Sequence, residues 1–412
     1  MDNIFRIFIL SAIWSIFFIK NFARYLNIRH IKETLPTEYQ DIYDQESYSK
    51  SQKYLRETTI FSMATSLLSS IILTICMLSG FFNYIDLIAR SYELSMSLTG
   101  IIFFGILFIL NDLVSIPFAI YNIFYLEEKF GFNKTTLNTF ILDKLKSYFL
   151  IMLIGAPVIF GILIFFEKYS LGWLYAWIAL SVFSLALQPI FTTFIAPMFN
   201  KFTPLEEGTL KEMIVAFADS VNFPIKNIDV IDGSKRSSKS NAYFSGIGKR
   251  KRIALYDTLI KNQNNHEILS IIAHEVGHYK KHHIWLNIFF SVIISGFNLY
   301  LLSLFINNTA LFVAFNMQPA NLSIYASLLF FSILFTPLDF ILSIFLNILS
   351  RKHEYEADAF AAEHTENPEL LISALKKLTS DNMGNLFPHP VYVFLNYSHP
   401  SVLSRINRLK ST

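Results

Sequence analysis

The chain has 412 residues, of which 53% are hydrophobic and 16% are charged. Its mean hydropathy of +0.42 excludes an ordinary soluble enzyme, because so much apolar surface must face lipid or a very large core. A net charge of +3 without a basic, aromatic-rich block argues against a nucleic-acid partner, and the single cysteine, Cys76, excludes a disulfide framework or a zinc site built from several thiolates.

Seven apolar stretches are long enough to cross about 30 Å of hydrocarbon as helices. They lie near residues 4–19, 62–83, 99–121, 147–166, 172–193, 285–306 and 324–349. No small-residue cleavage site follows the first stretch, which we therefore interpret as a retained span rather than a signal peptide. Asn111, Asp112 and Asp339 inside these stretches are costly in lipid, so we expect them to face a neighbouring helix or a water-filled space.

The positive charges indicate which end of the spans is cytoplasmic. Only Arg6, Arg90 and Lys168, of 34 lysines and arginines, fall on the side of the N-terminus. Because positive residues are retained in the cytoplasm, the opposite side, which contains residues 194–284 and 350–412, is predicted to be cytoplasmic.

Four parts are expected along the chain. Residues 1–196 form an N-terminal membrane region with five spans and their cytoplasmic loops, and residues 285–349 form the sixth and seventh spans. Residues 197–284 and 350–412 are two cytoplasmic parts. Since a hairpin of two spans separates these cytoplasmic parts in the sequence, we expect them to build one catalytic body together.

The first cytoplasmic part has both helical and strand patterns. One helix and three strands are predicted, at residues 205–221, 228–231, 241–244 and 252–256. The turn-forming Gly246-Ile247-Gly248 indicates a β-hairpin between the last two strands. A further helix is expected from about residue 265, and it is predicted to run into the sixth span through Trp285.

Residues 274–278 read HEVGH, which is a pattern with a specific chemistry. His274 and His278 are four apart, so they lie on one face of a helix and can bind one zinc ion together. Glu275 would then lie beside the open position of the metal, where it can take a proton from water. The alternative is a solvated, charged helix end.

A catalytic zinc needs a third protein ligand, and the best candidates follow the seventh span. Glu354 and Asp358 share a helix face, so one carboxylate can bind the metal while the other accepts the N–H of a histidine ligand. The alternative is ordinary charge pairing at a helix start. Glu356 is predicted to point elsewhere on this helix, and His282 and His283 are expected at the membrane interface rather than at the metal.

Several strings of the sequence resemble one known family, the integral-membrane CAAX prenyl proteases of type 1, which are gluzincin zinc endopeptidases. The matching strings occur in the family's order: EEKFGFNKT at 127–135, IAPMFNKFTPL at 195–205, SNAYF at 240–244, KRIALYDTL at 251–259, and SHP at 398–400 followed by Arg405. The resemblance implies an all-α integral membrane fold. Seven transmembrane helices would enclose an intramembrane chamber, and a cytoplasmic protease portion would contain a small β-hairpin or sheet.

The resemblance also implies roles for individual residues. His274, His278 and Glu354 would hold one zinc ion per chain, Glu275 would be the general base, and Asp358 would support a histidine ligand. These residues include Glu354 and Asp358, the two carboxylates that share a helix face after the seventh span.

Three further residues receive roles from the resemblance. His399 would donate a hydrogen bond to the oxyanion, which a zinc peptidase needs opposite its metal. Asn241 would bind substrate backbone beside an edge strand. Arg405, grouped with Asn241 as substrate-binding, would hold the segment that contains His399 by ion pairing. Without the family, a Ser-His-Pro turn and an Asn before a strand are common structural features.

The function that we predict is removal of the C-terminal tripeptide from prenylated CAAX-type peptides. One alternative is a bacterial quality-control zinc protease of membrane proteins without a prenyl requirement, and another is a seven-helix transporter or receptor with an incidental motif. The expected partners are a peptide or protein substrate and the lipid bilayer, and the expected state is a monomer. Since residues 408–412 contain no dilysine retrieval signal, a bacterial inner membrane is favoured over the endoplasmic reticulum.

Overall fold

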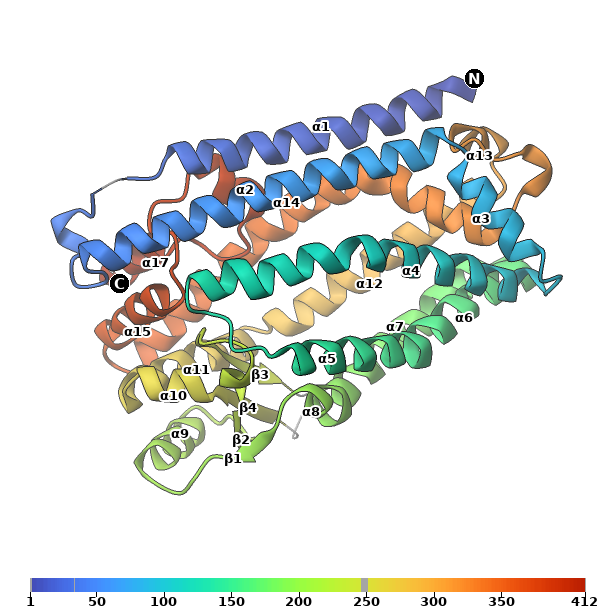
Figure 1. Cartoon of the computed structure of the whole chain (residues 1–412). Coiled ribbons are helices and arrows are strands. Elements are labelled where there is room, and N and C mark those ends of the chain that lie inside the picture. Colours follow the sequence, from blue (N-terminus) through green and yellow to red (C-terminus); the bar gives the residue numbers. More distant parts are fainter. Residues whose placement is uncertain (1, 33, 246–250, 412) are drawn as a thin grey trace.

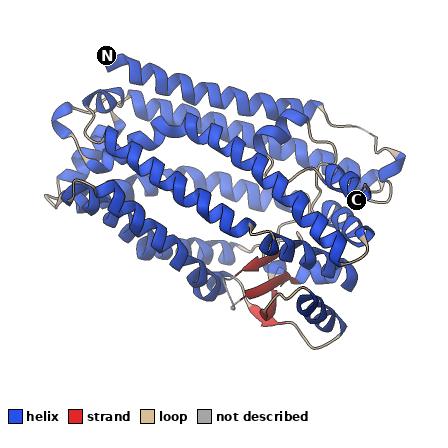
Figure 2. Ribbon diagram, turned by 180° about the vertical axis from the view of Figure 1, so that it is seen from behind, coloured by secondary structure: helices blue, strands red, loops and turns tan. Residues whose placement is uncertain are grey.

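The computed structural model describes residues 2–32, 34–245 and 251–411. It confirms the seven spans: seven helical segments of the described chain are long and apolar enough to cross a membrane. They are Ile4–Arg29, Gln45–Leu78, Met96–Glu127, Leu137–Lys168, Gly172–Phe199, His283–Phe305 and Ile324–His364. The long helices run side by side, and a small sheet lies at one end of them (Figures 1 and 2).

Several of these helices extend further than their apolar stretches. The second span is helix α2 (Gln45–Leu78), whose polar first half begins at an N-cap where the Asp44 side chain accepts a hydrogen bond from the backbone N–H of Ser47. The seventh span is helix α14 (Ile324–His364), which continues 15 residues past the predicted end at 349. Hydropathy detects only the lipid-facing part of such a helix, so the polar extensions were missed.

The end of the spans that lies far from the sheet is closed by two short helices (Figure 1). Helices α3 (Phe81–Arg90) and α13 (Thr309–Ala314) contribute to an apolar cluster that also includes residues of α1 (Asp2–Arg29) and α14. Phe82, Phe315 and Phe330 meet there, and the ring centroid of Phe82 lies 5.7 Å from that of each of the other two. Hydropathy had extended the second span to residue 83, but α2 ends at Leu78 and Gly80, with φ of 76°, turns the chain into α3.

The sheet has four strands in the order β1-β2-β4-β3. Their bounds are Phe202–Pro204 for β1, Ile225–Ile231 for β2, Ala242–Ser245 for β3 and Lys251–Tyr256 for β4. Strands β3 and β4 pair antiparallel, as the predicted hairpin requires, whereas β2 pairs parallel with β4. Because β3 is the last strand in this order, it lies at an edge of the sheet. The predicted turn at 246–248 lies outside the described residues.

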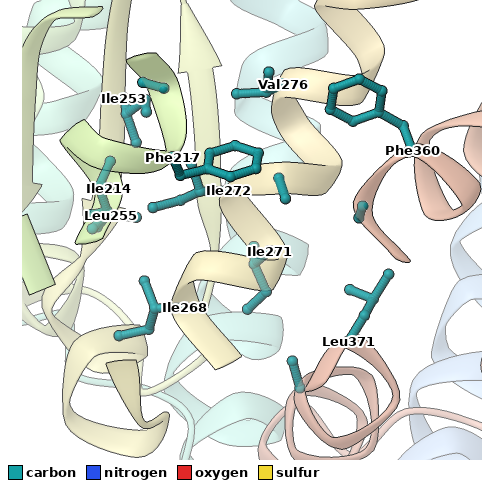
Figure 3. Packing of buried hydrophobic residues seen from close by; sticks show 14 of the residues in the cluster. Ile214, Phe217, Ile253, Leu255, Ile268, Ile271, Ile272, Val276, Phe360 and Leu371 are labelled. Atoms are coloured by element: carbon teal, nitrogen blue, oxygen red, sulfur yellow. The ribbon is translucent and has the colours of Figure 1, made fainter. Parts of the chain in front are cut away.

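Helix α11 (Asn265–Lys280) carries the HEVGH sequence and lies between the sheet and the C-terminal part of the chain. Its Ile272 and Val276 belong to one buried cluster with Ile253 of β4 and with Phe360 of α14 (Figure 3). The cluster joins residues 197–284 and 350–412 into a single core. A capping box begins the helix: the Asn264 side chain accepts from backbone N–H groups of the first turn, and the Glu267 carboxylate accepts from the backbone of Asn264.

The prediction that α11 runs into the sixth span is wrong. Helix α11 ends at Lys280, and helix α12 (His283–Phe305) begins three residues later. Between them His282 has a φ of 61°, a left-handed conformation that an α-helix cannot contain. The break turns the sixth span away from α11 and, as described below, brings His283 back toward the HEVGH residues.

Candidate metal centre

Two histidines of α11 and one carboxylate of α14 converge on a single point. The Nε2 atoms of His274 and His278 are 3.2 Å apart. Glu354 places Oε1 at 3.2 Å from His278 Nε2 and Oε2 at 3.4 Å from His274 Nε2. One ligand atom from each of the three residues lies within 4.8 Å of the others, and no other group of three such side chains is found in the part of the chain that the structure describes.

Close packing of the two helices makes this convergence possible. A Cβ atom added at Gly277 would lie 3.1 Å from both Cα and the carbonyl oxygen of Ala357 on α14. Glu354 precedes Ala357 by three residues, so it lies on the same face of α14. The glycine between Glu275 and His278 therefore permits the helix approach that carries Glu354 to the histidines.

The donor set fits a divalent cation. Glu354 is only 4% exposed, and among the described residues its Oε2 atom has no hydrogen-bond partner. The nearest nitrogen atoms to it are His274 Nε2 at 3.4 Å and Arg405 Nη1 at 3.5 Å. A buried carboxylate oxygen without a partner is costly unless a cation compensates it. Two imidazole nitrogens and one carboxylate are a common ligand set for catalytic zinc.

His274 is supported directly by a carboxylate. Its Nδ1 atom lies 2.9 Å from Asp358 Oδ1. Arg405 donates to both oxygens of Asp358, with Nε 2.8 Å from Oδ2 and Nη2 2.6 Å from Oδ1. Burial opposes protonation of His274, but the adjacent carboxylates of Asp358 and Glu354 outweigh it and raise its pKa to about 9. In the metal-free protein this ring therefore carries a proton that a metal must displace.

His278 has a different kind of support, which the sequence did not reveal. Its Nδ1 atom lies 3.0 Å from Nδ1 of His283, and His283 Nε2 lies 2.9 Å from Glu356 Oε2. The ring of His353 stacks on His283 at 4.0 Å between centroids.

As predicted, His283 is not in the ligand group, but it packs inside the protein. Its ring is buried, whereas that of His282 is exposed. Glu356 is indeed absent from the ligand group, but it points to His283. On a continuous helix a residue five positions after His278 would face another direction, so only the break at His282 explains the contact.

A cleft of about 390 Å³ lies beside the three ligands. Its walls include Glu275, His399, Asn241 and Arg405, so the segments before and after the last two spans both contribute to it. Asn241 is exposed at the start of edge strand β3, and its side-chain oxygen accepts a hydrogen bond from the backbone N–H of Ala242 at 2.8 Å.

His399 stands at the entrance of the metal centre. Its Nε2 atom lies 3.3 Å from Glu354 Oε1, and 63% of its side chain is exposed. Arg351 of α14 donates to the carbonyl oxygens of Val393, at 3.2 Å, and Tyr397. These contacts hold the short segment that leads to His399 against the helix that carries Glu354.

Comparison with known proteins agrees with this geometry. Residues 24–201 match the family described as "CAAX prenyl protease N-terminal, five membrane helices", and residues 204–412 match "Peptidase family M48". The chain belongs to the CAAX prenyl protease family of M48 peptidases. It is a multi-pass integral membrane metallopeptidase, which excludes the interpretation as a transporter or receptor with an incidental motif.

Individual relatives of the family cover nearly the whole chain. "CAAX prenyl protease 1" of Saccharomyces cerevisiae is 34% identical over 427 residues, which are 95% of this chain and 92% of that protein. The human "CAAX prenyl protease 1 homolog" is 34% identical over 461 residues, which are 98% of this chain and 96% of that protein. The crystal structure of S. mikatae Ste24p superposes with a TM-score of 0.93 at 33% identity, covering 98% of this chain and 99% of that one.

These relatives are eukaryotic proteins, and they weigh against the predicted bacterial inner membrane. The prediction depended on the absence of a dilysine signal, which concerns retrieval of a protein and says nothing about the membrane in which its family works.

Proposed function

We propose that the protein is a zinc endopeptidase that removes the C-terminal tripeptide from prenylated CAAX-type substrates, with one zinc ion held by His274, His278 and Glu354. The observation that carries the proposal is the convergence of these three side chains beside a cleft that Glu275 also lines. The names of the relatives support the substrate class.

The residues around the cleft suit hydrolysis by an activated water. A zinc ion bound there would supply a Lewis acid that lowers the pKa of water and polarises the scissile carbonyl. Glu275 accepts the proton of the attacking water and then returns it to the leaving amine. His399, beside Glu354 and exposed to the cleft, donates a hydrogen bond to the carbonyl oxygen as negative charge develops on it.

The edge strand provides a place for the substrate. An extended peptide can pair with β3 as an additional strand, and Asn241 at its start can bind the peptide backbone. For Arg405 we now propose a different role from substrate binding. Its guanidinium group is engaged by Asp358, so it supports the carboxylate that orients His274.

The organisation of the chain follows from the same site. We propose that residues 197–284 and 350–412 form one catalytic body, and that residues 1–196 and 285–349 form its membrane region. The buried cluster shared by α11, the sheet and α14 supports this division. All groups of the metal centre come from one chain, which supports a monomer as the catalytic unit.

We also propose that the metal centre faces the cytoplasm, because that side holds nearly all lysines and arginines. The eukaryotic relatives favour the endoplasmic reticulum over a bacterial inner membrane.

A cleavage assay tests the proposal. The purified protein is incubated with matched farnesylated and unprenylated CAAX peptides, with and without a chelator. We expect release of the tripeptide from the farnesylated peptide, loss of activity with the chelator, and recovery on addition of zinc. Glu275→Ala should reduce the rate by about 10²–10⁴-fold, the usual contribution of a general base. Glu363→Ala, at an exposed glutamate of α14, is the matched control.

Each proposed element can fail separately in this assay. Cleavage that survives the chelator, or full activity of Glu275→Ala, would contradict the metallopeptidase mechanism. Equal turnover of both peptides would contradict the prenyl requirement and support quality-control proteolysis instead.

A further inference from the structure

The support of His278 uses three side chains that the proposed mechanism leaves without a role. His283 lies with one ring nitrogen 3.0 Å from His278 Nδ1 and the other 2.9 Å from Glu356 Oε2. His353 covers the face of the His283 ring, with an angle of 10° between the two planes. His283 is only 2% exposed, so bulk water does not compete for its nitrogens.

The orientation of the rings determines where their hydrogens must be. His278 Nε2 faces His274 and Glu354, so it must offer its lone pair if a cation is bound there. A neutral imidazole then carries its hydrogen on Nδ1, which faces Nδ1 of His283. His283 Nδ1 must accept this hydrogen bond. The hydrogen of His283 is consequently on Nε2, where the carboxylate of Glu356 accepts it.

We propose that His283 and Glu356 are positioning residues that hold His278 in the tautomer able to bind the metal. The proposal rests on the proposed zinc site. Of the two neutral tautomers of His283, only one satisfies both contacts, and stacking on His353 prevents the ring from turning out of them. Without either contact, His278 can carry its hydrogen on Nε2 or rotate, and in both cases its lone pair no longer points at the metal.

The two histidine ligands thus reach a carboxylate by different routes. His274 contacts Asp358 directly, whereas His278 reaches Glu356 through the imidazole of His283. The second route depends on the break at His282, because it places the first residue of α12 against the last turn of α11.

Zinc affinity of the full-length, detergent-purified protein tests the proposal, measured by competition with a chromophoric chelator. His283→Phe keeps a flat ring against His353 but removes both nitrogens. Glu356→Ala removes the acceptor from a side chain that is 39% exposed, so it changes packing little. We expect both variants to bind zinc about 10–100-fold more weakly, the usual cost of losing such support. Saturating zinc should restore their peptidase activity, whereas it should not restore that of Glu275→Ala.

Two further variants separate positioning from general structural effects. Glu356→Gln retains an acceptor oxygen for His283 and should keep zinc affinity close to that of the unmodified protein. Lys352→Ala removes the exposed cation 3.7 Å from Glu356 and should leave the affinity unchanged.

The outcomes distinguish this proposal from the one on which it rests. If the unmodified protein binds no zinc, the proposed function fails. If it binds zinc and Glu356→Ala binds equally tightly, the positioning role is overturned while the proposed function stands. If Glu356→Gln and Glu356→Ala weaken zinc binding equally, the positioning role is also overturned, because an acceptor oxygen for His283 would then not be enough to maintain the affinity. The two Glu356 variants decide the matter even if His283→Phe does not fold.

Discussion

The two ends of the membrane helices both bury acidic groups, but they satisfy them differently. At the end formed by α3 and α13, Asp86 is fully buried, and it accepts hydrogen bonds from Arg90 at 2.8 Å and from the hydroxyl group of Tyr325. At the end that carries the sheet, Glu354 is almost as buried, yet its Oε2 atom has no hydrogen-bond partner among the described residues.

This difference separates structural from functional burial of charge. A carboxylate whose partners are all supplied by the protein adds to the stability of the packing around it. A carboxylate that is left incomplete needs a partner from outside, and the adjacent imidazoles indicate that the partner is a metal ion. We therefore expect substitutions at the far end to change stability, and substitutions at the sheet end to change metal binding or catalysis.

The largest effect is expected from widening the contact between α11 and α14. Gly277→Val places atoms where even a Cβ would be 3.1 Å from the backbone of Ala357, so α14 must move and carry Glu354 away from the histidines. We expect peptidase activity to fall about 100-fold or more, since a displacement of about 1 Å can cost that much. Gly105→Val is the control, because nothing lies within 4 Å of a Cβ at Gly105. Zinc affinity and cleavage rate are measured for both.

The second effect is a pH dependence of metal binding. Burial and Arg405 oppose protonation of His274, but Asp358 and Glu354 outweigh them and raise its pKa to about 9 in the metal-free protein. The proton on His274 stabilises the metal-free fold. This stabilisation is fully present at pH values below the ordinary pKa of histidine, and it is lost as the pH rises through about 9. Zinc must displace the proton, so its affinity should rise about tenfold per pH unit between pH 7 and 9. Calorimetry in buffers of different ionisation enthalpy should show proton release, and a pH-independent affinity would contradict the assignment.

A third prediction concerns the far end. Asp86→Ala leaves Arg90 and the Tyr325 hydroxyl without their shared acceptor and should destabilise the protein by about 2 kcal/mol. Cleavage and zinc affinity should remain unchanged at temperatures where the variant is folded. Thermal unfolding in detergent measures the first effect and the peptide assay the second. A loss of zinc affinity in this variant would show that the two ends are coupled, contrary to the contrast between Asp86 and Glu354.

The smallest effect is expected at Asn241. Its side chain bonds to its own strand through Ala242, so Asn241→Ala removes one contact to substrate without opening the metal centre. We expect KM for the peptide to rise about fivefold, because loss of one hydrogen bond worth about 1 kcal/mol weakens binding by about that factor. Zinc affinity should not change. An unchanged KM would mean that Asn241 serves only to begin β3.

Local sequence patterns were sufficient for much of the site. The spacing of His274 and His278 shows that they share a helix face, and the same argument pairs Glu354 with Asp358. Hydropathy alone located all seven spans, because crossing a membrane requires a continuous apolar stretch that no distant contact can replace. The resemblance to a known family supplied the link between the two helices.

Other features depended on tertiary structure. The polar extensions of α2 and α14 are helical although they lack the hydropathy of a span. The closure by α3 and α13 results from contacts between segments more than 200 residues apart, such as Asp86 with Tyr325. Spacing along a helix reports only which side chains share a face, and it does not say which other element that face will meet.

His283 shows this limit most clearly. From the sequence it is one of two histidines between a basic pair and an apolar stretch, which is typical of a membrane interface. Its place against His278 and Glu356 required a left-handed residue at 282 and the approach of α14, two facts about chain direction that residue spacing does not contain. The sequence by itself indicated the two histidines of the proposed metal site and the membrane spans, because the first follow from helical spacing and the second from continuous apolar stretches. Only the tertiary structure decided how each ligand is held, because that depends on where separate helices meet.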